Sequence, residues 1–280
     1  MKIKNCFLLF FVITCLFYLG CIGTVNNIRS ANDFDLQPKE KFNFMTFNIR
    51  VGCGWDSYGT SPYRCTPTKK NLNLVIEAIK SEDPDVVALQ EVKGFRQAEY
   101  IAKKLNMNFA YITHGGNHPW WGMAILSKFE ILNSKTSYIH YGRDVRSALI
   151  SEIKIDDNPY HFVNVHYHLG NYKSQVSSTM SIVNKIDGPV ILLGDFNRSD
   201  WDYEMEPVHD SLIDTCKAVS TENSKNVVTV GTGFGRIDYI FVQDKYFTVL
   251  DAGIVSVKKY RYASDHIAYY SIVKIKNQFN

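Results

Sequence analysis

The sequence lacks the features that would divide it into separate parts. No segment repeats at a fixed period, and no run rich in proline, or in glycine and serine, separates one half of the chain from the other. Of its 280 residues, 45% are hydrophobic and 21% are charged, so the chain is globular and long enough for one large domain or two small ones. We favour one large domain.

The sequence also lacks an excess of charge of one sign. Lysine and arginine together number 31, against 28 aspartate and glutamate residues, which gives a net charge of +3. The composition therefore does not indicate a basic stripe for nucleic acid, although a local basic patch remains compatible with it.

Cysteine is scarce in the part of the chain that we expect to fold, where Cys53, Cys65 and Cys216 occur. Their spacing matches no zinc pattern and no histidine lies near the first two, which argues against a zinc site. Cys53 and Cys65 enclose a loop rich in glycine and aromatic residues. A disulfide between them could close this loop in an oxidising compartment.

The N-terminus carries an apolar run that is short for a membrane-spanning helix. Two lysines precede the apolar segment from Phe7 to Leu19, which ends in small residues, the layout of a secretory signal. Residues 18–21, Tyr-Leu-Gly-Cys, resemble the bacterial lipoprotein cleavage box, in which the cysteine becomes the lipidated first residue. We expect residues 1–21 to be a signal peptide of this type, with Cys21 lipidated. Plain secretion and an uncleaved anchor are the alternatives.

The segment after this signal, residues 22–40, is polar and mixed in charge and is expected to be a flexible tether. The folded domain is expected at residues 41–276. We therefore expect an exported protein that is either attached to a membrane of the bacterial cell envelope through its lipid anchor or secreted.

The most informative stretch is Pro-Val-Ile-Leu-Leu-Gly-Asp-Phe-Asn at residues 189–197. Four consecutive apolar residues, followed by glycine, an acid and an amide, predict a strand that is buried on both faces and ends at Asp195 and Asn197. These two side chains would lie on the same side of an extended backbone, at a strand end where ligands collect in layered α/β proteins. The alternative for this segment alone is a strand that runs into an Asx-type turn.

Similar strands and several helices are predicted along the chain. Apolar alternation or continuous apolar runs predict strands near residues 42–49, 86–89, 109–113, 121–126, 131–139, 146–155, 160–168, 227–230, 237–242, 247–254 and 267–275. Helical periodicity predicts helices near residues 70–80, 98–105 and 174–186. We expect strands 121–126 and 131–139 to form a hairpin, and likewise the strands on either side of the turn at 156–159.

Polar residues stand at the ends of several of these strands. They are Asn48, Glu91, His166, Asp195, Asn197, Asp238, Asp265 and His266. Each residue alone could have a structural role, such as a turn or a helix cap. A purely structural explanation would need every one of these roles to hold at once, so we expect instead that the residues meet in one site. Carboxylates with amide support predict a Mg²⁺ site, with Mn²⁺ as a second candidate, and histidine beside aspartate fits acid–base chemistry.

Six short motifs make the chain resemble the endonuclease/exonuclease/phosphatase superfamily, which includes exonuclease III, pancreatic deoxyribonuclease and neutral sphingomyelinases. The motifs are Thr46-Phe47-Asn48, Leu89-Gln90-Glu91, Asn164-Val165-His166, Gly194-Asp195-Phe196-Asn197, Arg236-Ile237-Asp238-Tyr239 and Ser264-Asp265-His266. The resemblance covers about residues 42–275. It implies an α/β (α+β) fold, a four-layer α/β sandwich with two packed, mainly antiparallel β-sheets, and an active site where the strand ends meet.

The resemblance also implies a role for each of these residues. Glu91 would be the main Mg²⁺ ligand, supported by Asn48 and Asp265. The other roles are Asp195 as the acid that positions or deprotonates water, Asn197 as a phosphate contact, His266 as the imidazole beside the scissile phosphate, Asp238 as its orienting carboxylate and His166 as a second imidazole. Arg146 would contact phosphate, with a surface ion pair as its alternative. His168 competes with His166, which we favour because of its spacing from Asn164.

We therefore expect an exported Mg²⁺-dependent phosphoesterase, a monomer that acts on nucleic acid, a phospholipid head group or a small phosphorylated metabolite. The specific alternatives are a DNA nuclease and a sphingomyelinase-like or phospholipase C-like lipid hydrolase, and the non-enzymatic alternative is a binding module of the same fold. Candidate cations for a nuclease are Lys69, Lys70, Arg143, Arg146, Arg198, Lys258, Lys259 and Arg261. Candidate aromatic residues for substrate are Trp55, Tyr58, Tyr63, Trp120, Trp121, Trp201 and Tyr203.

Overall fold

The computed structural model describes residues 39–55, 65–114, 120–140, 144–219, 221–222, 227–230 and 235–276. The predicted signal peptide with Cys21, most of the predicted tether, and Tyr58, Tyr63 and Arg143 lie outside the described residues. Within the described part of the chain, no helix combines the length and the apolar character needed to cross a membrane.

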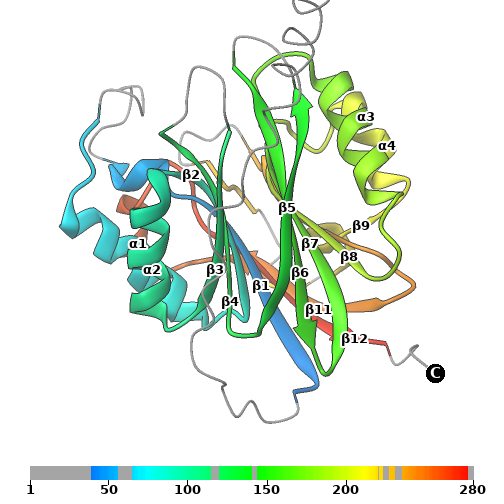
Figure 1. Ribbon diagram of the computed structural model, residues 1–280, viewed down its shortest axis with the longest axis horizontal. Coiled ribbons are helices and arrows are strands. Elements are labelled where there is room, and N and C mark those ends of the chain that lie inside the picture. Colours follow the sequence, from blue (N-terminus) through cyan, green and yellow to red (C-terminus); the bar gives the residue numbers. More distant parts are fainter. Residues whose placement is uncertain are drawn as a thin grey trace, which may run out of the picture.

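Two six-stranded β-sheets pack face to face (Figure 1). The first has the order β11-β12-β1-β2-β4-β3 and consists of β1 (Lys41–Asn48), β2 (Val86–Val92), β3 (Asn108–Thr113), β4 (Gly122–Ser127), β11 (Phe247–Ile254) and β12 (Tyr269–Ile275). The second has the order β5-β6-β7-β8-β10-β9 and consists of β5 (Ile131–His140), β6 (Arg146–Ile155), β7 (Asn158–His166), β8 (Val190–Asp195), β9 (Ile213–Asp214) and β10 (Asp238–Val242). Among the described pairs, β1 with β2 and β7 with β8 are parallel, and the others are antiparallel.

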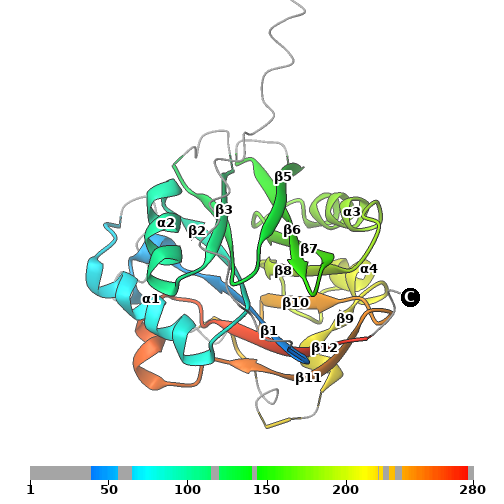
Figure 2. The ribbon, with the colours of Figure 1, turned by 60° about the horizontal axis from the view of Figure 1, so that its bottom comes forward.

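Helices cover the outer face of each sheet, as Figure 2 shows from a second direction. Helices α1 (Lys69–Glu82) and α2 (Gly94–Leu105) pack on the first sheet, and α3 (Tyr172–Val183) and α4 (Glu206–His209) pack on the second. The short elements are η1 (Arg50–Gly52), η3 (Tyr203–Met205), α5 (Thr215–Ala218) and η4 (Lys258–Tyr262). The predicted four-layer sandwich of two packed sheets is therefore confirmed.

The alternation of side chains along the strands decides which residues face the space between the sheets. In β1, Phe42 and Phe44 lie in the core between the sheets, whereas Met45 and Phe47 pack under the helices. In β8, Ile191 and Leu193 face the same inner core. The next residues in these inward series are polar, so the apolar layer between the sheets ends in polar side chains at one edge.

Gly194 allows two central strands to approach at this edge. Its φ is +143°, and a Cβ at this position would lie 2.0 Å from the carbonyl oxygen of Val165 in the neighbouring strand β7. A larger residue would push β7 and β8 apart, because the atoms that it would meet belong to the backbone of Val165 and not to a flexible side chain. The glycine thus fixes the spacing of the strands that carry His166 and Asp195.

The hairpin predicted for residues 121–126 and 131–139 is wrong. Strand β4 pairs with β2 and β3 in the first sheet, whereas β5 pairs with β6 in the second. The connection crosses between the sheets because Phe129 is buried in the inner core and the backbone N–H of Lys128 donates to the carbonyl oxygen of Asp85. The strand predicted at residues 227–230 is also wrong, since Val230 forms only an isolated bridge with His266 in the described part of that region.

Candidate active site

The polar side chains at the inner edge come from both sheets and meet around Asp195, which is 1% exposed. The side-chain amide of Asn48 donates to Asp195 Oδ2 over 3.0 Å, which links the end of β1 to the end of β8. His166 Nε2 and His266 Nε2 lie 3.5 and 3.7 Å from the same oxygen. The backbone N–H of Asn197 donates to Asp195 Oδ1 over 2.8 Å. Asp195 is thus the centre of the cluster.

Burial raises the pKa of Asp195 to about 6, against the lowering effects of His266 and of the hydrogen bonds from Asn48 and Asn197. This carboxylate is therefore ionised at neutral pH but retains more basicity than an exposed aspartate. Such a group is suited to holding a water molecule and accepting its proton.

His266 is held as an imidazolium by two carboxylates. Its Nδ1 lies 2.9 Å from Asp238 Oδ2, so Nδ1–H donates to that carboxylate. Burial alone would lower the pKa of His266, but Asp238 and Asp195 outweigh burial and raise it well above its usual value. At neutral pH, His266 can therefore present a positively charged Nε2–H toward Asp195.

His166 has the opposite protonation state. The guanidinium Nη1 of Arg146 lies 3.0 Å from His166 Nδ1, and arginine can only donate, so Nδ1 is the acceptor and the proton is on Nε2. Burial lowers the pKa of His166 well below its usual value, and the charge of Arg146 adds to this effect. The site therefore has two imidazoles beside Asp195 Oδ2, of which His166 is neutral and His266 is charged.

The structure places His166, and not His168, beside Asp195. His168 lies beyond the end of strand β7. Its Nε2 lies 3.2 Å from Asp144 Oδ2, and its Nδ1 accepts the backbone N–H of Gly170. Arg146 is buried and lies over the ring of Trp121, so it is not a surface side chain. A phosphate contact by Arg146 stays a prediction.

Glu91 reaches the site through a backbone irregularity. By alternation it would point toward the helices with Leu89, but a β-bulge shifts the pairing of β2 with β4 between Leu89 and Val92, and Glu91 has φ +53°. Its Oε1 consequently accepts the side-chain amide of Asn48 over 3.2 Å. Burial raises the pKa of Glu91 to about 7, and Asp265 adds to the increase.

The donor set around Glu91 fits a hard divalent cation. Glu91 Oε2 is buried and has no hydrogen-bond partner among the described residues, which leaves an oxygen available for a ligand. Of the two carboxylates that raise the pKa of Glu91, Asp265 has the larger electrostatic effect. Asn48 donates its amide nitrogen to Glu91 while its Oδ1 accepts the N–H of Arg50, so in this structure Asn48 orients carboxylates. Its role as a metal ligand stays a prediction.

A second group could also hold a metal ion, because ligand atoms of Asp195, Asp238 and His266 lie within 4.8 Å of one another. His266 Nδ1 is hydrogen-bonded to Asp238 Oδ2, so these three residues already form a hydrogen-bonded acid–base group. Within the described part of the chain, Glu91 has no such bond from a histidine, and we therefore favour Glu91 as the anchor for a metal ion.

Asn197 holds the turn after β8. It has φ +51°, its backbone N–H donates to Asp195, and its side-chain amide donates to the carbonyl oxygen of Tyr167 over 2.9 Å. The Asx-type turn considered for this segment is present together with the buried strand. The phosphate contact expected for Asn197 stays a prediction.

The sequence interpretation missed two supports of the site. Gln90 donates to Asn164 Oδ1 over 2.8 Å, a buried polar bridge between the first and second sheets. Arg50 is buried, has φ +45°, and brings its Nε within 3.4 Å of Asp265 Oδ2. Gln90 precedes Glu91 and Arg50 follows Asn48 closely, so their positions beside predicted strand ends were visible in the sequence. Their partners, Asn164 and Asp265, are distant in sequence and could not be predicted from it.

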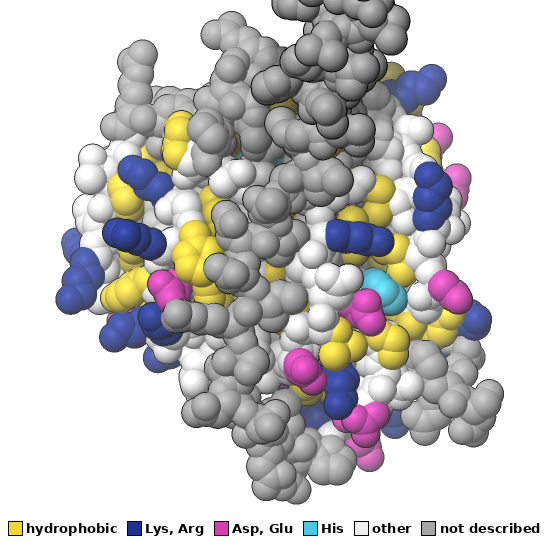
Figure 3. Space-filling view, in the orientation of Figure 1, with side chains coloured by type: hydrophobic (Ala, Val, Ile, Leu, Met, Phe, Trp, Pro, Cys, Tyr) yellow, Lys and Arg dark blue, Asp and Glu magenta, His cyan; other side chains and the backbone are white. Residues whose placement is uncertain are grey.

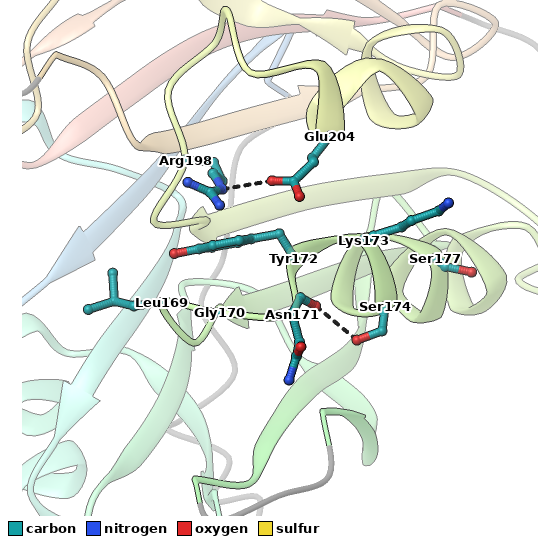
Figure 4. Close-up of a pocket in the computed structure, with 9 residues that line it drawn as sticks. All are labelled: Leu169, Gly170, Asn171, Tyr172, Lys173, Ser174, Ser177, Arg198 and Glu204. Atoms are coloured by element: carbon teal, nitrogen blue, oxygen red, sulfur yellow. Dashed lines mark hydrogen bonds and ion pairs between the residues drawn. The ribbon is translucent and has the colours of Figure 1, made fainter.

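A groove of about 760 Å³ runs beside the second sheet, at the start of α3 (Figure 4). Arg198 lies over the ring of Tyr172, with its guanidinium carbon 3.1 Å from the ring centroid. Its Nε is 3.1 Å from Glu204, and its Nη1 is 3.3 Å from Asp202. Two carboxylates thus balance the charge of Arg198, which weakens its candidacy as a phosphate-binding cation.

The candidate aromatic residues divide into buried and exposed ones. Trp121 is buried, and its ring contacts the ring of His166 edge-on at 5.4 Å, so it supports the site from inside. Trp201 and Tyr203 are 75% and 73% exposed.

Residues 45–266 match the sequence model of the Endonuclease/Exonuclease/phosphatase family. A search of curated proteins found no match. Among solved structures, a functionally unknown conserved protein from Enterococcus faecalis V583 is similar with a TM-score of 0.69 and 16% identity, covering 84% of this chain and 100% of that one. The human Nocturnin catalytic domain with bound sulfate has a TM-score of 0.69 and 16% identity, covering 85% of this chain and 94% of that one.

D. rerio TDP2, complexed with a single-strand DNA product, has a TM-score of 0.65 and 17% identity, covering 84% of this chain and 100% of that one. At these identities the structural likeness shows the fold. The family model spans most of the chain and includes the strand ends that carry Asn48, Glu91, His166, Asp195 and His266. The chain therefore belongs to the endonuclease/exonuclease/phosphatase family.

Proposed function

We propose that this protein is a metal-dependent phosphoesterase that hydrolyses phosphodiester or phosphomonoester bonds by direct attack of water. One observation carries the proposal: the neutral imidazole of His166 and the charged imidazole of His266 both lie beside the buried Asp195 carboxylate. Glu91, whose Oε2 has no hydrogen-bond partner among the described residues, belongs to the same cluster. This set combines a base, two donors of fixed protonation and a cation site, which are the groups that phosphoryl transfer from an ester to water requires.

In the proposed reaction, Asp195 accepts a hydrogen bond from the attacking water and takes its proton. As the water oxygen bonds to phosphorus, the bond from phosphorus to the leaving ester oxygen breaks, and that oxygen takes a proton from solvent water. Asn48 and the backbone N–H of Asn197 hold the carboxylate in place. His266, oriented by Asp238, donates Nε2–H to a phosphoryl oxygen whose negative charge increases during attack, and His166 offers a second, neutral N–H.

A divalent metal ion would be held by Glu91 and Asp265, where it would act as a Lewis acid on the phosphoryl group. The ionised Glu91 carboxylate is buried, so it needs a positive partner at neutral pH. Mg²⁺ suits an all-oxygen site of this kind, and Mn²⁺ would be the substitute with the same ligands.

Hydrolysis by the purified protein tests this proposal. The expected result is cleavage of bis(p-nitrophenyl) phosphate in the presence of Mg²⁺ or Mn²⁺, with loss of activity in EDTA and recovery when metal is restored. Plasmid DNA, RNA, sphingomyelin and phosphatidyl lipids, assayed in parallel, would identify the substrate class. A folded protein that binds Mg²⁺ but cleaves none of these substrates would contradict the proposal and favour a binding module of the same fold.

The neighbouring structures support phosphate-containing ligands without choosing among them. The Nocturnin domain was solved with sulfate and TDP2 with a single-strand DNA product, and both observations concern those proteins. On the face shown in Figure 3, several basic side chains gather on the left, over α1 and α2, and others lie on the right with acidic side chains near them.

We further propose that the protein is exported and held to a membrane through a lipidated Cys21. The signal-like segment and Tyr-Leu-Gly-Cys at residues 18–21 support this proposal. The wild type should fractionate with membranes, and Cys21→Ser should appear in the soluble or uncleaved fraction. Equal distribution of the two proteins would contradict lipid anchoring.

A further inference from the structure

A pocket of about 270 Å³ opens beside Asp265, between η4 and the segment that ends at Trp55. Its lining residues are Trp55, Lys258, Arg261, Tyr262, Ser264, Asp265 and Ile267. Asp265 and Ser264 belong to the motif that carries His266, and Asp265 affects the pKa of Glu91. The pocket is therefore continuous with the candidate active site.

The pocket combines aromatic rings with exposed positive charge. Trp55 and Tyr262 contribute the rings, and Tyr262 is 50% exposed. Lys258 and Arg261 are exposed, and no hydrogen bond or ion pair from their side chains is seen among the described residues. Their charge is thus available to a ligand, unlike that of Arg198 in the groove of Figure 4, which two carboxylates balance.

The wall that carries Trp55 is held in place by four connections. A disulfide joins Cys53 to Cys65, with 6.0 Å between their Cα atoms. The carbonyl oxygen of Cys53 accepts the side-chain amide of Asn71 over 2.6 Å, and that of Gly54 accepts Arg50 Nη1 over 3.2 Å. Gly54 also packs closely on η4, since a Cβ there would lie 2.9 Å from the carbonyl oxygen of Tyr262. The two walls of the pocket are thus fixed against each other.

We propose that this pocket is a subsite for one unpaired nucleotide of a single-stranded nucleic acid, adjacent to the scissile phosphate. The base would stack on Trp55 and Tyr262, and the next phosphate would contact Lys258 and Arg261. The pocket lies just below the range of about 300–1,000 Å³ that is typical of sites for drug-sized ligands, which suits one nucleoside and excludes a duplex. This inference rests on the proposed phosphoesterase function and specifies its substrate class.

The charges in the pocket argue against a choline head group. Aromatic residues bind quaternary ammonium groups through their ring faces, but Lys258 and Arg261 would repel such a cation. Asp265, the one carboxylate in the lining, is paired with Arg50, whose Nε lies 3.4 Å from its Oδ2. A nucleic acid has the opposite requirement, since a π-face and a neighbouring negative charge occur in every residue of the strand. The chemistry of the pocket therefore favours a nuclease over a sphingomyelinase.

Binding to the catalytically impaired Asp195→Asn protein tests the subsite without depending on turnover. The probe is fluorescein-labelled hexathymidylate, measured by fluorescence anisotropy, with an abasic strand of the same length for comparison. Trp55→Ala and Tyr262→Ala, each added to Asp195→Asn, should raise the Kd for hexathymidylate about tenfold and leave the weaker binding of the abasic strand unchanged. Trp55→Phe, which keeps an aromatic face, should restore most of the affinity.

The charge contacts have their own readout. The Lys258→Ala, Arg261→Ala double change should reduce the slope of log Kd against log salt by about 1 and weaken binding of both strands. Tyr100→Ala is the control, because Tyr100 is an aromatic residue of α2 outside this pocket, and it should not alter binding. Circular dichroism melting of every variant verifies that each is folded.

Two results would overturn the inference. One is unchanged affinity for hexathymidylate in both Trp55→Ala and Tyr262→Ala while the proteins remain folded. The other is binding of sphingomyelin vesicles that these substitutions abolish, which would assign the pocket to a lipid surface. Hydrolysis of bis(p-nitrophenyl) phosphate by the wild type is measured separately, so failure of the subsite and failure of the phosphoesterase proposal can be distinguished.

Discussion

Replacing Asp195 with asparagine is expected to lower kcat by about 10³-fold, within the roughly 10²–10⁴-fold contribution that general acid–base groups make. The amide cannot accept a proton from water, and its NH₂ group would face donors that now point at Asp195 Oδ2, namely Asn48 and the two histidines. The measurement is the initial rate on bis(p-nitrophenyl) phosphate with saturating Mg²⁺.

The matched control for this substitution is Asp144→Asn, which changes an acid that contacts His168 and lies outside the cluster. Asp144→Asn should retain wild-type kcat, and both variants should unfold within a few degrees of the wild type. If Asp195→Asn kept more than a tenth of the wild-type rate, Asp195 would not be the base.

Glu91→Gln is expected to stabilise the metal-free protein at alkaline pH while removing metal-dependent hydrolysis. The carboxyl group has a pKa of 4.5 in its reference state and about 7 in the folded protein, chiefly because it is buried. Between these pH values the unfolded chain releases its proton first, so the free energy of unfolding of the wild type falls as pH rises from 4.5 through 7. The full loss is about 3 kcal/mol, at about 1.4 kcal/mol per pKa unit.

Glutamine cannot ionise, so the variant should escape this loss. In EDTA, urea unfolding should show equal stability of the two proteins at pH 4 and a variant that is more stable by up to about 3 kcal/mol at pH 8. Asp195 titrates in the same direction in both proteins, so the difference between them isolates Glu91. Added Mg²⁺ should stabilise the wild type but not the variant, because the metal binds the folded state through this carboxylate.

The control for this pH dependence is Glu77→Gln, which alters an exposed glutamate paired with Lys259. It should change stability by no more than about 0.5 kcal/mol at either pH. A Glu91→Gln protein that is less stable than the wild type in EDTA at pH 8 would contradict this prediction. It would show that contacts within the protein stabilise the ionised carboxylate without a cation.

Strand periodicity was sufficient to predict most of the architecture and part of the site. Inward-facing positions recur at every second residue of a strand. Asn48 therefore faces the same space between the sheets as Phe44, and Asp195 faces the same space as Leu193. The polar residues at the ends of such strands mark one edge of the core. The helix at residues 70–80 and the turn at residues 156–159 were also predictable from local pattern, since both depend on neighbours in sequence.

The remaining features depend on contacts between distant residues. Strict alternation would direct Glu91 toward the helices, and only the bulge opposite β4 turns it inward. The protonation state of His166 depends on Arg146, which lies on another strand. The crossing from β4 to β5 depends on where Phe129 is buried, a property of the packed sheets and not of the short connection itself.

The polar bridge from Gln90 to Asn164 joins the two sheets directly behind the catalytic groups. Glu91, the proposed cation ligand, lies in the first sheet, and Asp195, the proposed base, lies in the second. We therefore expect hydrolysis only when the two sheets are packed together. Separating the sheets would part the reactive groups and disrupt the core between the sheets in the same event. Catalysis is thus coupled to the cooperativity of the whole fold, and thermal inactivation should coincide with global unfolding and should not precede it.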